Sequence, residues 1–478
     1  MRSGRARTSR HRVSTGSASQ VQPVRNSGSV VTVPNPRPCT WSTGPVSDLV
    51  QLRGATFDAV IDVSTATPGI VHWGEPLGAD PDLDELVAAL ARPTVAGALG
   101  SVAPVGVVPL HADGFAGRPG LAGRRGGGRD WSPRFVPSGH RISDGVLTVD
   151  AVDDAAGLAI STQITVGDVL GVRATLTNVA DRRYSLDALT LSLPLPEGAD
   201  ELLRFEGRWA REFHPIRASW SDGAVVSEHL RGRTSHEHPP LLFAGRSGFG
   251  EWVGEVHGVH LAWSGNHTLL AERLADGRRY VQAGELLHPG EVVLEPGESY
   301  TTPQLLGVYS TGGLTPATWG FHRAARRSPA HPTSPRPVLL NTWEAVYFHH
   351  DHDTLRELAE VAASVGIERF VLDDGWFCSR RDDTSGLGDW VVSSDVYPAG
   401  LGPLIDHVTG LGMEFGIWVE PEMVNPDSDL YRSHPDWALT TEGYEPVLGR
   451  NQLVLDLGQP EAFAHVLGQL DALLSDHD

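Results

Sequence analysis

The sequence predicts a multidomain protein in which an antiparallel β-sandwich is followed by an incomplete (β/α)₈ TIM barrel. Its 478 residues exceed what one hydrophobic core usually holds. Short β-forming runs fill the first part of the chain, whereas strands alternate with amphipathic helices in the last part. The expected segments are a disordered tail (1–45), the sandwich (46–312), a linker (313–337) and the first part of a truncated barrel (338–478).

The segment 46–312 contains runs of β-forming residues that are separated by clusters of turn residues. This spacing is typical of an antiparallel sandwich. The glycine-rich stretch Gly114–Gly128 can bury little side-chain surface, so we expect a long loop there. The expected strands are 57–63, 145–152, 158–166, 189–195, 259–263 and 299–309.

The composition limits the partners and the compartment. The formal net charge is −21 and the chain has no lysine, which makes binding to nucleic acid or to an anionic membrane surface unfavourable. No apolar run approaches the roughly 20 residues that cross a bilayer. The tail is rich in Arg and Ser and lacks acidic residues before Asp48. Cys39 and Cys378 form neither a disulfide framework nor a zinc set, so we expect a cytoplasmic protein without a metal or cofactor.

The segment 338–478 reads as a series of β/α units. A strand at Leu339–Trp343, a helix through Leu355, Ala359 and Ala362, and a strand at Phe370–Leu372 form one βαβ unit. A helix (401–411), a strand (415–419), an extra strand (452–457) and a terminal helix (461–476) follow. Closing a barrel needs eight strands, so three or four repeats would leave sheet edges open, and we expect a fragment of a longer protein.

Acidic and aromatic residues follow the predicted barrel strands, where active sites of such barrels lie. Carboxylates accept hydrogen bonds from sugar hydroxyls, and aromatic faces pack on the apolar face of a pyranose. The mixture therefore favours carbohydrate binding. The residues are Trp343 and Glu344 after the first strand, Asp373 and Asp374 after the second, and Trp418, Glu420 and Glu422 after the third.

Simpler interpretations exist for these residues. An Asp-Asp pair at a strand end can be a solvated cap, and Trp343 and Trp418 can be core residues. Glu420 and Glu422 flank Pro421, which indicates a bend, and we expect them to brace the pocket by hydrogen bonds. A nearby cluster of histidines and acids suggests helix capping by Asp353 rather than a metal site. Trp376 is expected to be structural.

Six motifs in one order give a more specific indication. They are Asn341-Thr-Trp-Glu-Ala345, Val371-Leu-Asp-Asp-Gly-Trp-Phe377, Leu387-Gly-Asp-Trp390, Trp418-Val-Glu-Pro-Glu-Met-Val424, His434-Pro-Asp-Trp437 and Gly449-Arg-Asn-Gln-Leu-Val-Leu-Asp456. Together they resemble the α-galactosidases of glycoside hydrolase family 36. Looser matches in the sandwich are Val71-His-Trp-Gly74, Gly207-Arg-Trp-Ala-Arg-Glu212 and Trp263-Ser-Gly-Asn266.

The resemblance implies hydrolysis of terminal non-reducing α-D-galactosyl residues of oligosaccharides, with retention, by the full-length protein. It implies that Asp373, Asp374 and Arg450 bind galactose and that Trp343 and Trp418 line the pocket. It also implies a homotetramer in which Trp209 of one subunit reaches a neighbour's active site.

The resemblance also implies that the nucleophile and the acid/base of the family are not among the residues of this chain. The family's nucleophile is an Asp in a Lys-Trp-Asp motif and its acid/base is a later Asp, and neither matches this chain. A retaining glycosidase needs two carboxyl groups about 5 Å apart, so we expect no catalytic residue here and no activity of the chain alone. Two alternatives stay open: a related α-galactosyl transferase of the raffinose synthase kind, and a non-catalytic sugar-binding or scaffold remnant.

Overall fold

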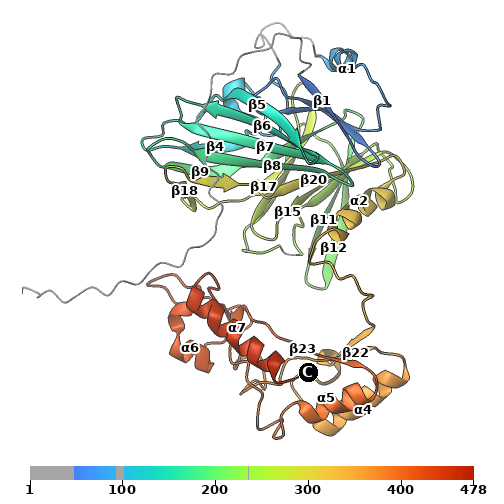
Figure 1. Cartoon of the computed structure of the whole chain (residues 1–478), viewed down its shortest axis with the longest axis vertical. Helices are drawn as coiled ribbons and strands as arrows, with labels where there is room; N and C mark the ends of the chain where they lie inside the picture. The colour runs from blue at the N-terminus through green and yellow to red at the C-terminus, as the bar shows by residue number, and fades with distance from the viewer. Residues whose placement is uncertain (1–47, 93–101, 235, 478) are drawn as a thin grey trace, which may run out of the picture. The chain divides into compact units, whose positions relative to one another are not determined.

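A computed structural model describes residues 48–92, 102–234 and 236–477. The chain divides into two compact units between Ala324 and Ala325, and each unit is described by itself (Figure 1). The predicted tail 1–45, together with Cys39, lies outside the described residues. Among the described helices, none is long and apolar enough to cross a membrane.

The first unit is built around one large antiparallel sheet, which confirms the predicted sandwich. Inward-facing residues alternate with outward-facing ones along its strands, as in Leu158, Ile160 and Ile164. In order, the sheet contains β12 (Arg211–Ser219), β11 (Glu201–Arg208), β14 (Leu241–Gly245), β15 (Val256–Ala262), β20 (Gln304–Ser310), β8 (Leu170–Asn178), β7 (Leu158–Val166), β6 (Val146–Asp153) and β5 (Val136–Ser143), and β19 (Ser299–Thr301) also pairs with β8.

Smaller sheets complete this unit. They are β10–β17–β16–β13 (Leu191–Leu195, Arg279–Glu285, His267–Arg273, Gly223–His229), β18–β9–β4 (Val292–Leu294, Tyr184–Leu189, Leu121–Arg124) and β1–β2–β3 (Leu49–Arg53, Asp58–Asp62, Gly69–Gly74). A short helix, α1, covers Leu83–Leu90. One hydrophobic core joins the sheets: Ile160 of the large sheet, Val281 of β17, Leu186 of β9 and Ile61 of β2 belong to the same buried cluster.

Three expectations for this unit were wrong or incomplete. The glycine-rich loop contains β4, because Gly123 lets this strand approach the Tyr184 ring so closely that a Cβ would lie 2.6 Å from it. The run 189–195 is divided at Thr190, where the chain passes from β9 to β10 in a different sheet. The expected linker begins with helix α2 (Leu314–Arg326), whose Leu314 and Ala317 pack in a buried cluster with Phe243 and Val308 of the large sheet (Figure 1).

The second unit contains a three-stranded parallel sheet, β21–β22–β23 (Leu339–Asn341, Arg369–Leu372, Glu414–Ile417). Helix α4 (His352–Ser364) connects the first two strands and α5 (Gly402–Gly410) connects the last two, as predicted. Asp351, not Asp353, caps α4 by accepting a hydrogen bond from the Thr354 amide at 2.8 Å. The first strand ends earlier than expected, because Trp343 begins the short helix α3 (Trp343–Val346).

The remaining elements of this unit are small except for the last helix. They are β24 (Met423–Val424), α6 (Asp429–Ser433), β25 (Leu453–Val454) and α7 (Pro460–Ser475). Strand β25, shorter than the expected 452–457, pairs with β24. Only part of the predicted apolar stripe of α7 is covered within this unit, since Val466 and Leu473 are buried whereas Phe463, Leu467 and Leu474 are more than half exposed.

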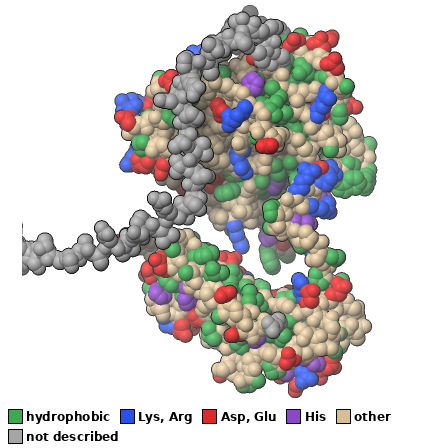
Figure 2. Space-filling view, viewed as in Figure 1, with side chains coloured by type: hydrophobic (Ala, Val, Ile, Leu, Met, Phe, Trp, Pro, Cys, Tyr) green, Lys and Arg blue, Asp and Glu red, His purple; other side chains and the backbone are tan. Residues whose placement is uncertain are grey.

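The surface of the described residues mixes charges of both signs. On the face shown in Figure 2, arginine and acidic side chains lie interspersed over the first unit. Charged side chains form ion pairs in both units, as Arg217 does with Glu201 in the first and Arg432 with Asp427 and Asp429 in the second.

Candidate functional site

The three parallel strands of the second unit end side by side, and the candidate residues follow these ends. In the register of the sheet Asn341 pairs with Val371 and Leu372 pairs with Ile417. The next residues along each strand therefore lie at one edge of the sheet, which is where the active sites of β/α barrels are built. The sequence correctly predicted that Trp343, Asp373, Asp374 and Trp418 come from these exits.

Asp373 is held in place from the neighbouring strand exit. Its carboxylate accepts hydrogen bonds from the Asn341 side-chain amide and from the Asp374 backbone amide, the latter at 2.7 Å. Its own amide donates to the Thr342 hydroxyl at 3.0 Å. Asp373 is 7% exposed, so these contacts fix the orientation of a carboxylate that retains some access to solvent. Asn341 also accepts a hydrogen bond from the Trp343 amide, which links the tryptophan to the same network.

Asp374 forms a buried ion pair that the sequence did not predict. Arg380, which is fully buried, donates from Nε to Oδ1 at 2.9 Å and from Nη2 to Oδ2 at 2.7 Å. This two-point contact is the geometry in which arginine binds a carboxylate most specifically. Burial raises the pKa of the Asp374 carboxyl, and the Arg380 guanidinium opposes that rise.

Gly375 turns the chain directly after the acidic pair. Its φ of 116° is in the region that only glycine adopts readily, and a Cβ there would lie 3.2 Å from the Phe348 backbone and the His350 ring. A larger residue would therefore displace both the turn and the loop that packs against it.

Asn425 connects the ion pair to the turn that carries Arg450. Its Oδ1 accepts a hydrogen bond from Arg380 Nη1 at 3.1 Å, and its Nδ2 donates to the Asn451 carbonyl at 2.8 Å. Asn425 is fully buried, and its position was not predicted. The acidic pair and the Arg450 turn therefore belong to one hydrogen-bonded network.

Arg450 lies in an unusual two-residue turn. Arg450 and Asn451 both have positive φ, 53° and 61°, and the Gln452 amide donates to the Gly449 carbonyl at 3.0 Å. This is the pattern of a type I′ turn, which glycine and asparagine adopt more easily than arginine. A positive φ at an exposed arginine costs local stability, and such strain is found preferentially at functional sites.

Glu420 shares the electrostatic environment of these groups. Burial and the like charge of Glu422 raise the pKa of Glu420, whereas Arg450 and Arg380 lower it and Asp374 adds a small rise. The Met423 amide donates to the Glu420 carbonyl at 3.1 Å, so the predicted bend at Pro421 is confirmed. Within the described part of the chain neither glutamate side chain forms a hydrogen bond, so the expected bracing of the pocket stays a prediction.

The tryptophans differ in how far they are buried. Trp376 is fully buried and donates from its indole to the Trp418 carbonyl at 2.9 Å, which confirms its structural role. Trp343 and Trp418 are half-buried. The Trp343 ring lies edge-on to Tyr347 and Phe348, and the Trp418 ring lies edge-on to Trp390 with centroids 6.1 Å apart. Both rings therefore keep surface available at the strand exits.

Trp209 lies in the other unit, at the tip of the β11–β12 hairpin. The register pairs Arg208 with Arg211, so Trp209 and Ala210 form the turn. The Trp209 side chain is 79% exposed and its only described ring contact is an edge contact with His236, 6.0 Å between centroids. An exposed tryptophan at a hairpin tip is costly in water and is typical of a contact residue.

The described residues contain no group of three or more His, Cys, Asp or Glu side chains arranged for a metal ion. The histidine-rich segment before α4 has other contacts. Asp351 caps the helix, and His350 contacts the Tyr397 hydroxyl at 2.8 Å while burial lowers its pKa to about 4.

The parallel strands end in an acidic pair and two partly exposed tryptophans, and Asn425 links the acidic pair to the Arg450 turn. Together with the β-sandwich unit, this arrangement is typical of the class of carbohydrate-active β/α-barrel proteins. Comparison with known proteins gives the family. Residues 66–295 match the N-terminal domain of glycosyl hydrolase family 36, and residues 299–478 match the melibiase family. The chain belongs to glycoside hydrolase family 36.

Named relatives agree with this assignment. An α-galactosidase of Escherichia coli is 44% identical over 438 residues, covering 90% of this chain and 61% of that protein. The α-galactosidase AgaA of Geobacillus stearothermophilus is 36% identical over 345 residues, covering 70% of this chain and 47% of that protein. The crystal structure of AgaA superposes with a TM-score of 0.82 at 29% identity, covering 89% of this chain and 64% of that one. This chain thus spans less than two thirds of these relatives.

Proposed function

We propose that this chain provides the sandwich and the galactose-binding side of a retaining α-galactosidase that releases terminal non-reducing α-D-galactosyl residues from oligosaccharides. The observation that carries the proposal is the fixed acidic pair. Asp373 is oriented by Asn341 and Thr342, and Asp374 by Arg380. Two adjacent, rigid carboxylates suit a pair of neighbouring sugar hydroxyls, because each can accept hydrogen bonds without reorganisation.

The neighbours of the acidic pair fit the same role. Trp343 and Trp418 offer partly exposed rings for the apolar face of the sugar. Arg450 lies on the turn anchored by Asn425 and can donate to a further hydroxyl. Variants of AgaA have been solved in complexes with stachyose and raffinose, so we propose oligosaccharides of this kind as substrates.

The same contacts explain why we do not assign catalysis to these residues. Retention requires one carboxyl group that attacks the anomeric carbon and one that donates and then accepts a proton. The Asp374 carboxylate is paired with Arg380, and the Asp373 carboxylate accepts hydrogen bonds from the Asn341 side chain and from the backbone. The 478 residues contain no lysine, and so no Lys-Trp-Asp motif. We therefore propose that the residues of this chain bind substrate but do not turn it over.

Two further proposals concern the assembled protein. We propose a homotetramer in which the Trp209 hairpin contributes to the site of another subunit, supported by the exposure of this side chain. We also propose a cytoplasmic location, supported by the small number of cysteines.

The test compares hydrolysis of p-nitrophenyl α-D-galactoside by the 478-residue chain and by the longer product of the same reading frame. We expect turnover only by the longer protein, with no cleavage of the β-anomer. In the longer protein, Asp373→Asn should reduce kcat/KM by about 100-fold or more, because hydrogen bonds from sugar hydroxyls to a charged acceptor are lost. Asp406→Asn, an exposed position on α5, is the matched control.

Either of two results would contradict the proposal. Turnover by the 478 residues alone would show that the catalytic carboxyl groups are among those described here. Full activity of the Asp373→Asn variant would remove the acidic pair from the galactose site.

A further inference from the structure

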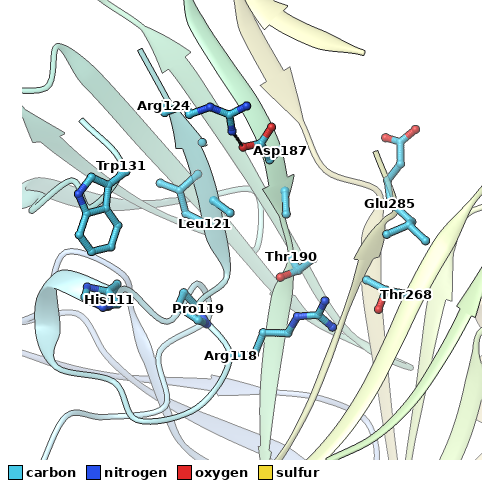
Figure 3. Close-up of a pocket in the computed structure, with 14 residues that line it drawn as sticks. His111, Arg118, Pro119, Leu121, Arg124, Trp131, Asp187, Thr190, Thr268 and Glu285 are labelled. Carbon is cyan, nitrogen blue, oxygen red and sulfur yellow. Dashed lines mark hydrogen bonds and ion pairs between the residues drawn. The ribbon is translucent and has the colours of Figure 1, made fainter. Parts of the chain in front are cut away.

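The sandwich unit contains a hollow of about 490 Å³ that is separate from the strand exits of the second unit (Figure 3). It lies where residues of β4 and β9 face residues of β16 and β17, next to the point at Thr190 where the chain changes sheets. Its size is within the range of sites that hold small ligands.

One end of the hollow is aromatic. Trp131 is 55% exposed, and its ring lies 4.7 Å from that of His111, centroid to centroid. Figure 3 shows both rings at the same end of the hollow, beside Leu121 and Pro119. The His111 ring contacts the Ser132 hydroxyl at 3.2 Å, which helps to fix its position. The exposed indole offers a flat apolar surface to a ligand.

The other end contains a buried hydroxyl without a partner. Thr268 is 6% exposed, and its Oγ1 has no hydrogen-bond partner among the described residues. Its position in β16 is fixed on both sides, since it pairs with Glu228 of β13 and Gly284 of β17. A buried hydroxyl without a partner is destabilising, and a ligand in the hollow that Thr268 lines would provide one.

The remaining polar groups present both donors and acceptors. The Arg118 guanidinium has one long ion pair, 3.7 Å to Glu228, and can donate further hydrogen bonds. Thr190 donates to the Gly120 carbonyl at 3.3 Å, so its oxygen can accept. Glu285 accepts from the Tyr300 hydroxyl at 2.5 Å through one oxygen. Mixed donors and acceptors suit hydroxyl groups, each of which donates once and accepts twice.

The charges of the residues that line the hollow cancel. Two arginines, Arg118 and Arg124, are matched by Asp187 and Glu285, and Arg124 pairs directly with Asp187. A site for a phosphate or a carboxylate ligand would have an excess of positive charge. The balance therefore favours a neutral, hydroxyl-rich ligand.

We propose that this hollow is a second saccharide-binding site, in which Trp131 packs on the apolar face of a pyranose and Thr268, Arg118 and Glu285 bind its hydroxyls. The expected occupant is a galactosyl oligosaccharide. This choice rests on the proposed function, whereas the existence of the site rests on the geometry of the sandwich. The site would hold substrate on the protein without contributing to catalysis.

The test measures raffinose binding to the 478-residue chain by saturation-transfer NMR. Trp131→Ala should weaken binding at this site about tenfold, because it removes the aromatic surface. Thr268→Val removes one hydroxyl while keeping the shape, and should weaken binding about fivefold. Trp252→Ala, which removes a tryptophan that is 66% exposed and does not line the hollow, is the control and should have no effect.

The Asp373→Asn variant separates this site from the strand exits. Raffinose binding that persists in Asp373→Asn and is lost when Trp131→Ala is added supports the second site. If Trp131→Ala weakens binding and Asp373→Asn changes nothing, the second site stands and the proposed function loses its galactose site. If only Asp373→Asn weakens binding, and Trp131→Ala and Thr268→Val melt at the temperature of the parent chain, the inference is overturned and the proposed function is unaffected.

Discussion

Replacing Arg380 with methionine should destabilise the second unit strongly. The side chain is fully buried and donates to Asp374 at 2.9 and 2.7 Å and to Asn425 at 3.1 Å. Methionine keeps most of the apolar stem but leaves the Asp374 carboxylate buried without its cation. Breaking a buried pair in this way costs about 3–5 kcal/mol. For a unit of this size each kcal/mol lowers the melting temperature by about 2–4 °C, so we expect a decrease of about 6–20 °C.

Differential scanning calorimetry of the 478-residue chain can measure this change, because two compact units can give separate transitions. Only the transition of the second unit should move. Arg432→Met is the matched control: Arg432 pairs with Asp427 and Asp429 in the same unit but is 54% exposed, so no resolvable shift is expected. The double variant Arg380→Met, Asp374→Leu should recover part of the loss, because no buried charge then remains unpaired. A shift of Arg380→Met no larger than that of Arg432→Met would refute the buried ion pair.

Two other predictions address the sandwich unit. Burial lowers the pKa of His257 from 6.5 to about 4. As the pH drops from 6.5 towards 4, this histidine therefore binds a proton in the unfolded chain before it does in the folded one, and the free energy of unfolding falls by about 1.4 kcal/mol per pH unit. His257→Gln should flatten this part of the urea-unfolding profile while the exposed control His140→Gln leaves it unchanged, and an equal slope in both variants would contradict the burial argument. Trp209→Ala should leave the melting temperature unchanged, because the side chain is 79% exposed. It should nevertheless lower kcat/KM of the longer, assembled protein about tenfold. Kinetics equal to those of Trp252→Ala would exclude a role for the hairpin at the site.

The regular elements could be predicted because they depend on local patterns. Alternation of apolar residues located β7, and the βαβ pattern located β22 with α4 and the acidic pair that follows. Helix α2 was missed because its arginines and the prolines that follow it resembled a linker, although Leu314, Ala317 and Phe321 share one helical face. Strand β4 was missed because it forms by pairing with β9, more than 60 residues along the chain, which the local glycine content does not reveal.

The site residues also divide into those that a local sequence pattern reveals and those that depend on long-range contacts. Asp373 and Asp374 follow a strand, which a local pattern reveals, but Arg380 and Asn425 acquire their importance from a loop that folds back over Asp374. The pairing of Arg380 with Asp374 and Asn425 joins positions 6 and 45 residues apart, and no local period connects them. One signal was available: Asn425 is a polar residue directly after the apolar pair of β24, and a polar residue in such a place needs a hydrogen-bonded partner.

The Arg450 turn has a consequence for protein engineering. A type I′ turn at 449–452 would be more stable with glycine or asparagine at position 450 than with arginine, whose side chain penalises a φ of 53°. A library screened only for heat resistance would therefore enrich Arg450→Gly and lose the guanidinium that we assign to the sugar. At position 450, consensus design or selection for thermostability should therefore be combined with a selection for galactoside hydrolysis, so that a gain in thermal stability does not remove the sugar-binding side chain.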